Sequence, residues 1–318
     1  MNRSHRLLAP LLVVVGGSEI AHAKLLTDDY LADVREAFAH MYNLDYESSL
    51  AGFEELRDAH PGHPGPHLDL AIVVWQRELF RRRELRLDRF VSPGQFSEST
   101  DESMPEAARR AFESHIAAAE RLATARLDAD PDDPDGLYYL GEVRAIQASF
   151  ALTIERDKIR SFKLGRRAHE LHYRLVELDR SHIDAYLTLG TYEYIVDDLP
   201  WYVKWLATLV GFQGDEERGL DFLKTVAERG RRARDVARVL TMVLLVREEQ
   251  LESALELAVS LEEDFPKNYL FALNRIEILE KMDRDDEAVE QYRRLLDRTR
   301  RRHLPDYVRE RAEEALAQ

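Results

Sequence analysis

Hydrophobic residues recur along most of this chain at steps of three and four, which is the spacing of helices with one apolar face. In the stretch 251–266, for instance, Ala254, Ala258 and Leu261 are separated by such steps, with glutamate and serine between them. Groups of proline and glycine, such as 60–66, separate one helical stretch from the next. Alternating runs of β-branched residues, which would predict strands, are absent from the sequence. The pattern therefore predicts an all-α protein.

The helical stretches also repeat along the chain. Ala288, Tyr292 and Leu295 stand 34 residues after the three residues just named. An alanine in the first column lets two antiparallel helices approach closely, and the apolar residues after it pack on the next pair. A period of 34 with this order of columns resembles the second half of a tetratricopeptide repeat, which is a helical hairpin.

The same columns continue upstream in a single frame of five units. The positions predicted to pack the repeats are Phe53, Pro61, Ala119, Pro131, Gly141, Ala168, Gly190, Ala254, Pro266, Ala288 and Tyr292. In one unit Arg180 replaces the proline that ends the second helix elsewhere. The resemblance implies a right-handed α-solenoid of antiparallel helical hairpins, and the polar stretch from Leu304 onward is expected to be the helix that caps it.

Two segments, near 84–104 and 195–214, break the spacing of the repeats. The second contains "LPWYVKWLATLVGFQGD", residues 199–215, with Trp201 and Trp205. We expect a short helix there, too short to span a bilayer. Three interpretations stay open: a helix packed between hairpins, one wall of a pocket for an apolar ligand, or an element that dips into a membrane.

A second resemblance covers about 40 residues around this insert. The stretch 189–226 is similar to a segment of the inclusion body clearance family of tetratricopeptide-like proteins. The matching positions are Pro200, Lys204, Leu206, Gly211, Gly214, Asp215, Gly219, Leu220 and Leu223. The resemblance implies a non-enzymatic protein that acts through contacts with other proteins.

The N-terminus has the three-part pattern of a secretory signal peptide. Arg3 and Arg6 precede the apolar run "LLAPLLVVVGG", and Ala21 and Ala23 stand where small residues precede a cleavage site. We therefore predict a signal peptide over residues 1–23, a repeat domain over 24–318, and a periplasmic or secreted bacterial protein. After cleavage, no integral membrane segment is expected.

Composition narrows the classes of function. The net charge of −15 disfavours nucleic acid as a partner, because an acidic chain repels phosphate. The absence of cysteine excludes disulfides, thiol catalysis and iron–sulfur clusters. The basic runs 81–89, 229–234 and 298–303 are interpreted as solvated helix faces or ends, with a docking patch for an acidic partner as the alternative.

Histidines provide the only candidate metal chemistry. His60, His63 and His67 lie within "HPGHPGPH", but the prolines there favour a loop between helices over a metal site. The "HELH" run, His169 to His172, has the wrong spacing for a zinc protease, so a packing role is favoured. Motifs of nucleotide-binding and serine hydrolase sites do not occur. Neither a metal nor a cofactor is predicted.

The leading interpretation is an exported, non-catalytic scaffold that binds a protein or peptide partner in a concave groove. The groove candidates are Tyr138, Thr191, Tyr194, Trp201 and Trp205, although tyrosines in these columns can also fill the seams between helices. The alternative is a periplasmic ligand-binding component of an uptake system, holding a small apolar molecule near the aromatic helix at 200–212. A hydrolase that uses the histidine clusters is a third, weaker hypothesis.

Overall fold

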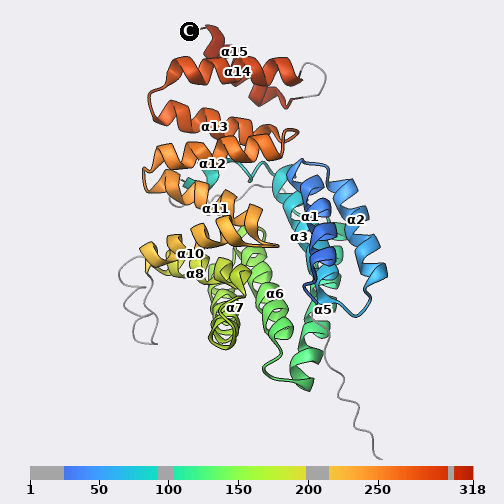
Figure 1. Cartoon of the computed structure of the whole chain (residues 1–318). Helices are drawn as coiled ribbons and strands as arrows, with labels where there is room; N and C mark the ends of the chain where they lie inside the picture. The colour runs from blue at the N-terminus through green and yellow to red at the C-terminus, as the bar shows by residue number, and fades with distance from the viewer. Residues whose placement is uncertain (1–24, 92–102, 198–214, 300–303, 318) are drawn as a thin grey trace, which may run out of the picture.

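The computed structural model describes residues 25–91, 103–197, 215–299 and 304–317, and every regular element in those ranges is a helix. The long helices of these ranges pack in six pairs along the chain (Figure 1). The first helices of the pairs are α1 (Asp28–Tyr42), α3 (Pro64–Arg81), α6 (Pro134–Thr153), α8 (Tyr186–Asp197), α11 (Arg234–Arg247) and α13 (Tyr269–Lys281). Their partners are α2 (Tyr46–Ala59), α5 (Glu106–Ala129), α7 (Lys158–Leu178), α10 (Glu216–Arg229), α12 (Leu251–Asp264) and α14 (Asp285–Thr299). The protein is thus an all-α solenoid of helical hairpins.

Three further elements complete the described chain. A short helix, α4 (Leu87–Val91), follows α3, and a 3-10 turn, η2 (Ile183–Ala185), leads into α8. The final helix, α15 (Asp306–Ala317), covers α14 at the end of the stack, as its polar sequence predicts (Figure 1). None of the helices in the described ranges has both the length and the apolar character needed to span a bilayer.

The turns inside the hairpins share one backbone conformation, although different residues occupy them. Five first helices are followed, two or three positions later, by a residue with positive φ: Leu44, Arg83, Arg156, Glu249 and Asp283, at 55–63°. In the first of these turns, the amide of Asp45 donates to the carbonyl of His40. The turns at Arg83, Glu249 and Asp283 have an equivalent bond, whereas after Arg156 the amide of Asp157 donates to a carbonyl one residue further back, that of Ala151. This is a left-handed C-terminal cap, which satisfies free carbonyls and reverses the chain direction. The shared cap gives successive hairpins the same geometry.

Four of the turns between hairpins also share one form. In each of them, the amide of the fourth residue donates to the carbonyl of the first: His63 to His60, Asp133 to Asp130, His182 to Asp179, and Asn268 to Phe265. Pro61, Pro131 and Pro266, which the sequence assigned to repeat packing, are exposed second residues of these turns. Proline suits that place because its fixed φ matches the turn, and Arg180 occupies it in the remaining one. These prolines therefore shape the turn and do not pack between hairpins.

The small and apolar residues at equivalent positions of the repeats lie buried between packed helices. Ala119, Ala168 and Ala254 have no exposed surface, and Ala288 has 2%. Phe53 and Tyr292, on second helices, are buried to the same degree. A residue as small as alanine at these sites lets neighbouring helices approach closely, and a larger side chain would separate them.

Three glycines mark close contacts between helices. A Cβ atom on Gly190 of α8 would lie 2.6 Å from the carbonyl oxygen of Gly219 on α10, and the reverse contact would be 2.8 Å. These two helices therefore touch through their backbones. A Cβ on Gly141 of α6 would lie 2.2 Å from the ring of His172, so this glycine makes room for a buried imidazole.

The array curls until its first hairpin meets the fifth and sixth. The ring of Tyr42 lies 4.9 Å from that of Phe265, and the side chain of Asn268 donates to the carbonyl of Tyr42 at 2.7 Å. The amide of Lys267 donates to the side chain of Asn43 at 3.0 Å. Figure 1 shows α1 beside the orange helices of the C-terminal half. The inner face, meaning the side formed by the first helices, is thus narrowed by contacts of the chain with itself.

Candidate functional site: an arginine-lined pocket

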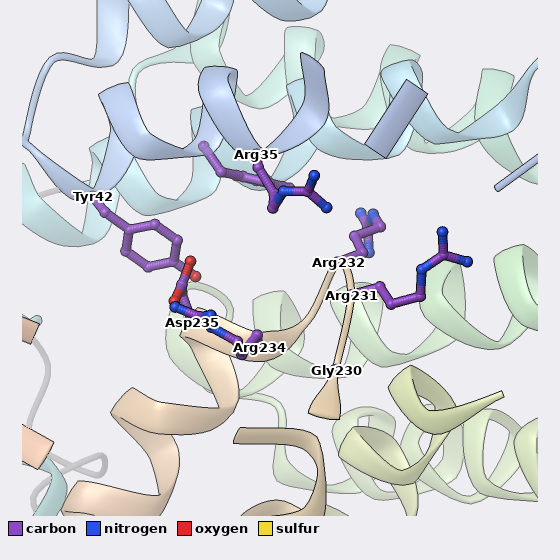
Figure 2. Close-up of a pocket in the computed structure, with 8 residues that line it drawn as sticks. Arg35, Tyr42, Gly230, Arg231, Arg232, Arg234 and Asp235 are labelled. Atoms are coloured by element: carbon purple, nitrogen blue, oxygen red, sulfur yellow. The ribbon is translucent and has the colours of Figure 1, made fainter. Parts of the chain in front are cut away.

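A pocket of about 270 Å³ opens on the inner face where α1 meets the turn between α10 and α11. Arg35, Phe38 and Tyr42 line it from α1. Residues Gly230 to Arg232, Arg234 and Asp235 line it from the other side. Figure 2 shows the arginine side chains of both elements around this space. The site therefore combines four guanidinium groups with two aromatic rings.

The four arginines differ in how far their charges are neutralised. Arg35 is exposed and makes no ion pair with any residue that the structure describes. Arg231 pairs with Asp28, whose side chain is 92% exposed. Arg234 pairs with Asp235 at 3.5 Å and lies 4.0 Å from Asp264, the latter at the outer limit of an ion pair. Because exposed pairs of this kind contribute little, these three arginines can turn towards an anion that enters the pocket.

Arg232 has a different role, since its side chain is only 3% exposed. It pairs with Asp69 of α3 and, at 3.1 Å, with Glu142 of α6. Its guanidinium also donates to the hydroxyl of Tyr138 at 3.4 Å. One side chain from the turn thus joins two first helices that precede it by 163 and 90 residues.

The backbone of this turn is held by Asp184 of η2. Its carboxylate accepts hydrogen bonds from the amides of Arg231 at 2.9 Å, and of Arg232 and Ala233 at 3.1 Å. Successive amides around one carboxylate form a compact anion-binding nest. Gly230 stands close by, because a Cβ there would lie 2.9 Å from the same carboxylate. These hydrogen bonds hold the backbone of the turn in place. The backbone in turn sets the positions from which the side chains of Arg231, Arg232 and Arg234 extend.

Burial shifts the pKa values of the charged groups beneath the pocket, which are Asp69, Glu142 and Arg232. Removal from water raises the pKa of Asp69 to about 6, although Arg232 acts to lower it. The pKa of Glu142 is raised for the same reason. Burial alone would lower the pKa of Arg232, but Asp69, together with Tyr138, Glu142 and Tyr139, raises that pKa well above its usual range. The guanidinium therefore stays charged beneath the pocket.

None of the predicted groove residues that the structure describes lines this pocket. Tyr138 and Tyr194 are 1% and 3% exposed, so neither side chain offers surface to a partner in this structure. The curl of the array explains this burial for Tyr138, which lies beneath the turn that carries Arg232. Tyr194 instead donates to Glu248 of the next hairpin at 2.7 Å. Thr191 is partly exposed, and Trp201 and Trp205 lie outside the described residues.

The histidines of the two sequence motifs have structural contacts. His63 accepts from the amide of Gly65 at 2.9 Å and donates to the carbonyl of Leu25 at 3.3 Å, so it caps α3. His172 donates to the carbonyl of Tyr138 at 3.0 Å and is fully buried. Within the described residues, no three His, Cys, Asp or Glu side chains are grouped closely enough to hold a metal ion.

Lowering the pH from 7.5 to 5 should lower the free energy of unfolding. Burial holds the pKa of His63, His115 and His172 at about 4, below the value near 6.5 expected in an unfolded chain. Their stabilising contribution is complete above about pH 6.5 and is lost as the pH falls towards 4. Asp69 acts in the opposite sense, because the contribution of an acid with a raised pKa is lost as the pH rises through about 6. Urea denaturation should show a lower midpoint at pH 5 than at pH 7.5. An equal or higher midpoint at pH 5 would mean that the buried carboxylates, and not the histidines, determine how stability changes with pH.

The sequence identifies the basic run that supplies three of the pocket arginines, but it does not predict a pocket there. The sequence predicts a solvated run at 229–234, with a docking patch as the alternative, whereas the structure shows that Arg232 within it is buried. The two acids that pair with Arg232 do indicate a buried ion pair in the sequence. Asp69 and Glu142 interrupt apolar first helices in "LDLAIVV" and "YYLGEV". A buried acid needs a cation, but the sequence does not say which arginine supplies it.

Comparisons with known proteins leave the family open. No protein family and no curated protein matches the chain. Among solved structures, Naa15/Naa10 bound to HypK-THB aligns at 15% identity over 91% of this chain and 39% of that chain, with a TM-score of 0.33. Yeast Tom70 aligns at 12% identity over 92% of this chain and 90% of its own, with a TM-score of 0.28. Likeness this low carries no argument, so the fold assignment rests on the hairpins and turns described above.

Proposed function

We propose that the protein is a non-catalytic, exported scaffold that binds an acidic segment of a partner protein in the arginine-lined pocket. The observation that carries the proposal is the position of Arg35, an exposed guanidinium without an ion pair among the described residues, at a pocket whose other side holds Arg231 and Arg234. A chain with a net charge of −15 gathers three available cations around one concave space. A pocket lined by several positive charges favours a negatively charged ligand.

The chemistry of the lining favours carboxylates as the bound groups. A guanidinium presents its donors in a planar fork that matches the two oxygens of a carboxylate. Phe38 and Tyr42 add aromatic surface beside these forks, on which the apolar part of a side chain can pack. An extended peptide with several acidic residues supplies both kinds of contact, whereas a small inorganic anion supplies only one.

Two parts of the proposal rest on the sequence alone. Export depends on the signal-like pattern at 1–23, which lies outside the described residues. The alternative function, a carrier of a small apolar molecule near 200–212, falls on residues that are equally outside them. The acidic partner, in contrast, is supported by the positions of Arg35, Arg231 and Arg234 around the pocket.

Reversing the charge of Arg35 should abolish most of the binding of an acidic peptide. The probe is a fluorescent hexaglutamate peptide, added to the full chain and followed by fluorescence anisotropy at several salt concentrations. We expect binding that weakens as salt rises, and a loss of roughly tenfold or more in affinity for Arg35→Glu.

The matched control is Arg167→Glu on α7. Arg167 is also an exposed helical arginine without an ion pair in the described part of the chain. Its reversal makes the same change in net charge far from the pocket, so it should leave the affinity nearly unchanged. If both variants lose affinity equally, or if the wild-type chain does not bind the peptide, the proposed function fails.

A further inference from the structure

Two histidines on neighbouring helices converge outside the arginine-lined pocket. His67 lies in the first turns of α3, and His115 lies on α5. Their Nδ1 atoms are 3.3 Å apart, and the ring planes are inclined at 41°. Both side chains are partly exposed, so an ion from solvent can reach them. The sequence motif "HPGHPGPH" contains His67 but gives no sign of its partner 48 residues later.

The spacing of these two atoms fits one metal ion. Two nitrogen ligands bound at about 2.0–2.1 Å with tetrahedral angles stand roughly 3.3–3.4 Å from each other. From this agreement we propose that His67 and His115 form a two-histidine site for a divalent transition metal ion. Copper(II) should bind more tightly than zinc, following the general order of affinities for nitrogen ligands.

The protonation state of the pair is suitable for coordination. Burial lowers the pKa of His115 to about 4 and also lowers that of His67, so both rings are neutral at pH 7. Neutral imidazole is the form that binds metals. The nearby Arg57 and Arg121 also act to lower the pKa of His67, and their charge weakens the binding of any cation. We therefore expect a weaker site than one with four protein ligands.

The remaining coordination positions must be filled from outside the pair. Among the described residues, no third His, Cys, Asp or Glu joins the two rings. Water or a donor group from another molecule would complete the shell, as at open metal sites. A hydrogen bond between the two rings, with one Nδ1 protonated, would produce the same distance. The experiment has to separate these two explanations.

Titration calorimetry of the full chain with copper(II) and with zinc(II) provides the first measurement. We expect copper to bind more tightly than zinc, and His67→Ala and His115→Ala each to weaken this binding by roughly tenfold or more. The control is His40→Ala, which removes a half-exposed histidine that faces Asp45 at 3.6 Å. Equal binding by all variants would place the metal elsewhere, and absence of binding by the wild-type chain would leave only the hydrogen bond.

Electron paramagnetic resonance of the copper-loaded chain provides a second measurement, independent of affinity. Coupling of the copper signal to two imidazole nitrogens is expected in the wild-type chain and in His40→Ala. A signal with one coupled imidazole nitrogen is expected in either single variant of the pair. An unchanged spectrum in both variants would overturn the proposal. This inference does not depend on the proposed function, because the arginine-lined pocket shares no residue with the pair.

Discussion

Replacing Arg232 by methionine should lower the free energy of unfolding by about 3–5 kcal/mol. The substitution removes the cation that faces Asp69 and Glu142, both of which are almost wholly buried. Two carboxylates without a counterion must then either take up protons or stay charged in a medium of low polarity. Urea denaturation followed by circular dichroism measures the loss.

Two further variants show whether this loss comes from the buried charges. Arg231→Met changes the adjacent residue, whose ion pair with Asp28 is exposed, and should cost less than about 1 kcal/mol. Adding Asp69→Asn and Glu142→Gln to Arg232→Met should restore part of the stability, because the uncompensated charges are removed with their partner. If Arg232→Met and Arg231→Met proved equally stable, Arg232 would not join the hairpins as described.

Replacing Gly190 by alanine should destabilise the protein by about 1–3 kcal/mol, the usual range for overpacking. The new Cβ would lie 2.6 Å from the carbonyl oxygen of Gly219 and 3.0 Å from side chains of α10. Backbone atoms cannot rotate away, so α8 and α10 must move apart. Helix propensity alone predicts the opposite sign, since alanine is favoured over glycine in helices by about 1 kcal/mol.

Gly165 of α7 provides the matched control for this substitution. A Cβ there would meet only the ring of Tyr192 at 3.6 Å, an ordinary contact distance. Gly165→Ala should therefore stabilise the protein by about 0.5–1 kcal/mol through its effect on the helix. Denaturation midpoints that shift in opposite directions for the two variants support the backbone contact, and a stabilised Gly190→Ala would contradict it.

Much of the architecture was predictable from local pattern. The 34-residue spacing of Ala254 and Ala288 predicted hairpins of the observed kind, because small residues in the seams follow from close helix packing. The start of α1 has a local signal of the same kind, since the hydroxyl of Thr27 accepts from the amide of Tyr30. Signals of this kind depend on residues within one or two turns of each other, so the sequence displays them directly.

The pocket was not predictable, because it depends on the curl of the whole array. Contacts such as Tyr42 with Phe265 join residues more than 200 positions apart, and no local spacing encodes them. The same curl buries Tyr138, which a regular open array would have presented to solvent. In the sequence, Arg35 lies on the polar face of an ordinary amphipathic helix, where arginine is common. Only its place at the pocket beside Arg231 and Arg234 makes it a candidate for binding.

The most direct test of the account is to locate where an acidic peptide attaches. A hexaglutamate peptide carrying a photo-crosslinker can be irradiated with the full chain, and the labelled sites identified by mass spectrometry. We predict crosslinks to α1 and to residues 230–235, and their loss in Arg35→Glu. Crosslinks confined to other surfaces, such as the exposed face of α7 with Lys163 and Arg167, would contradict the central claim.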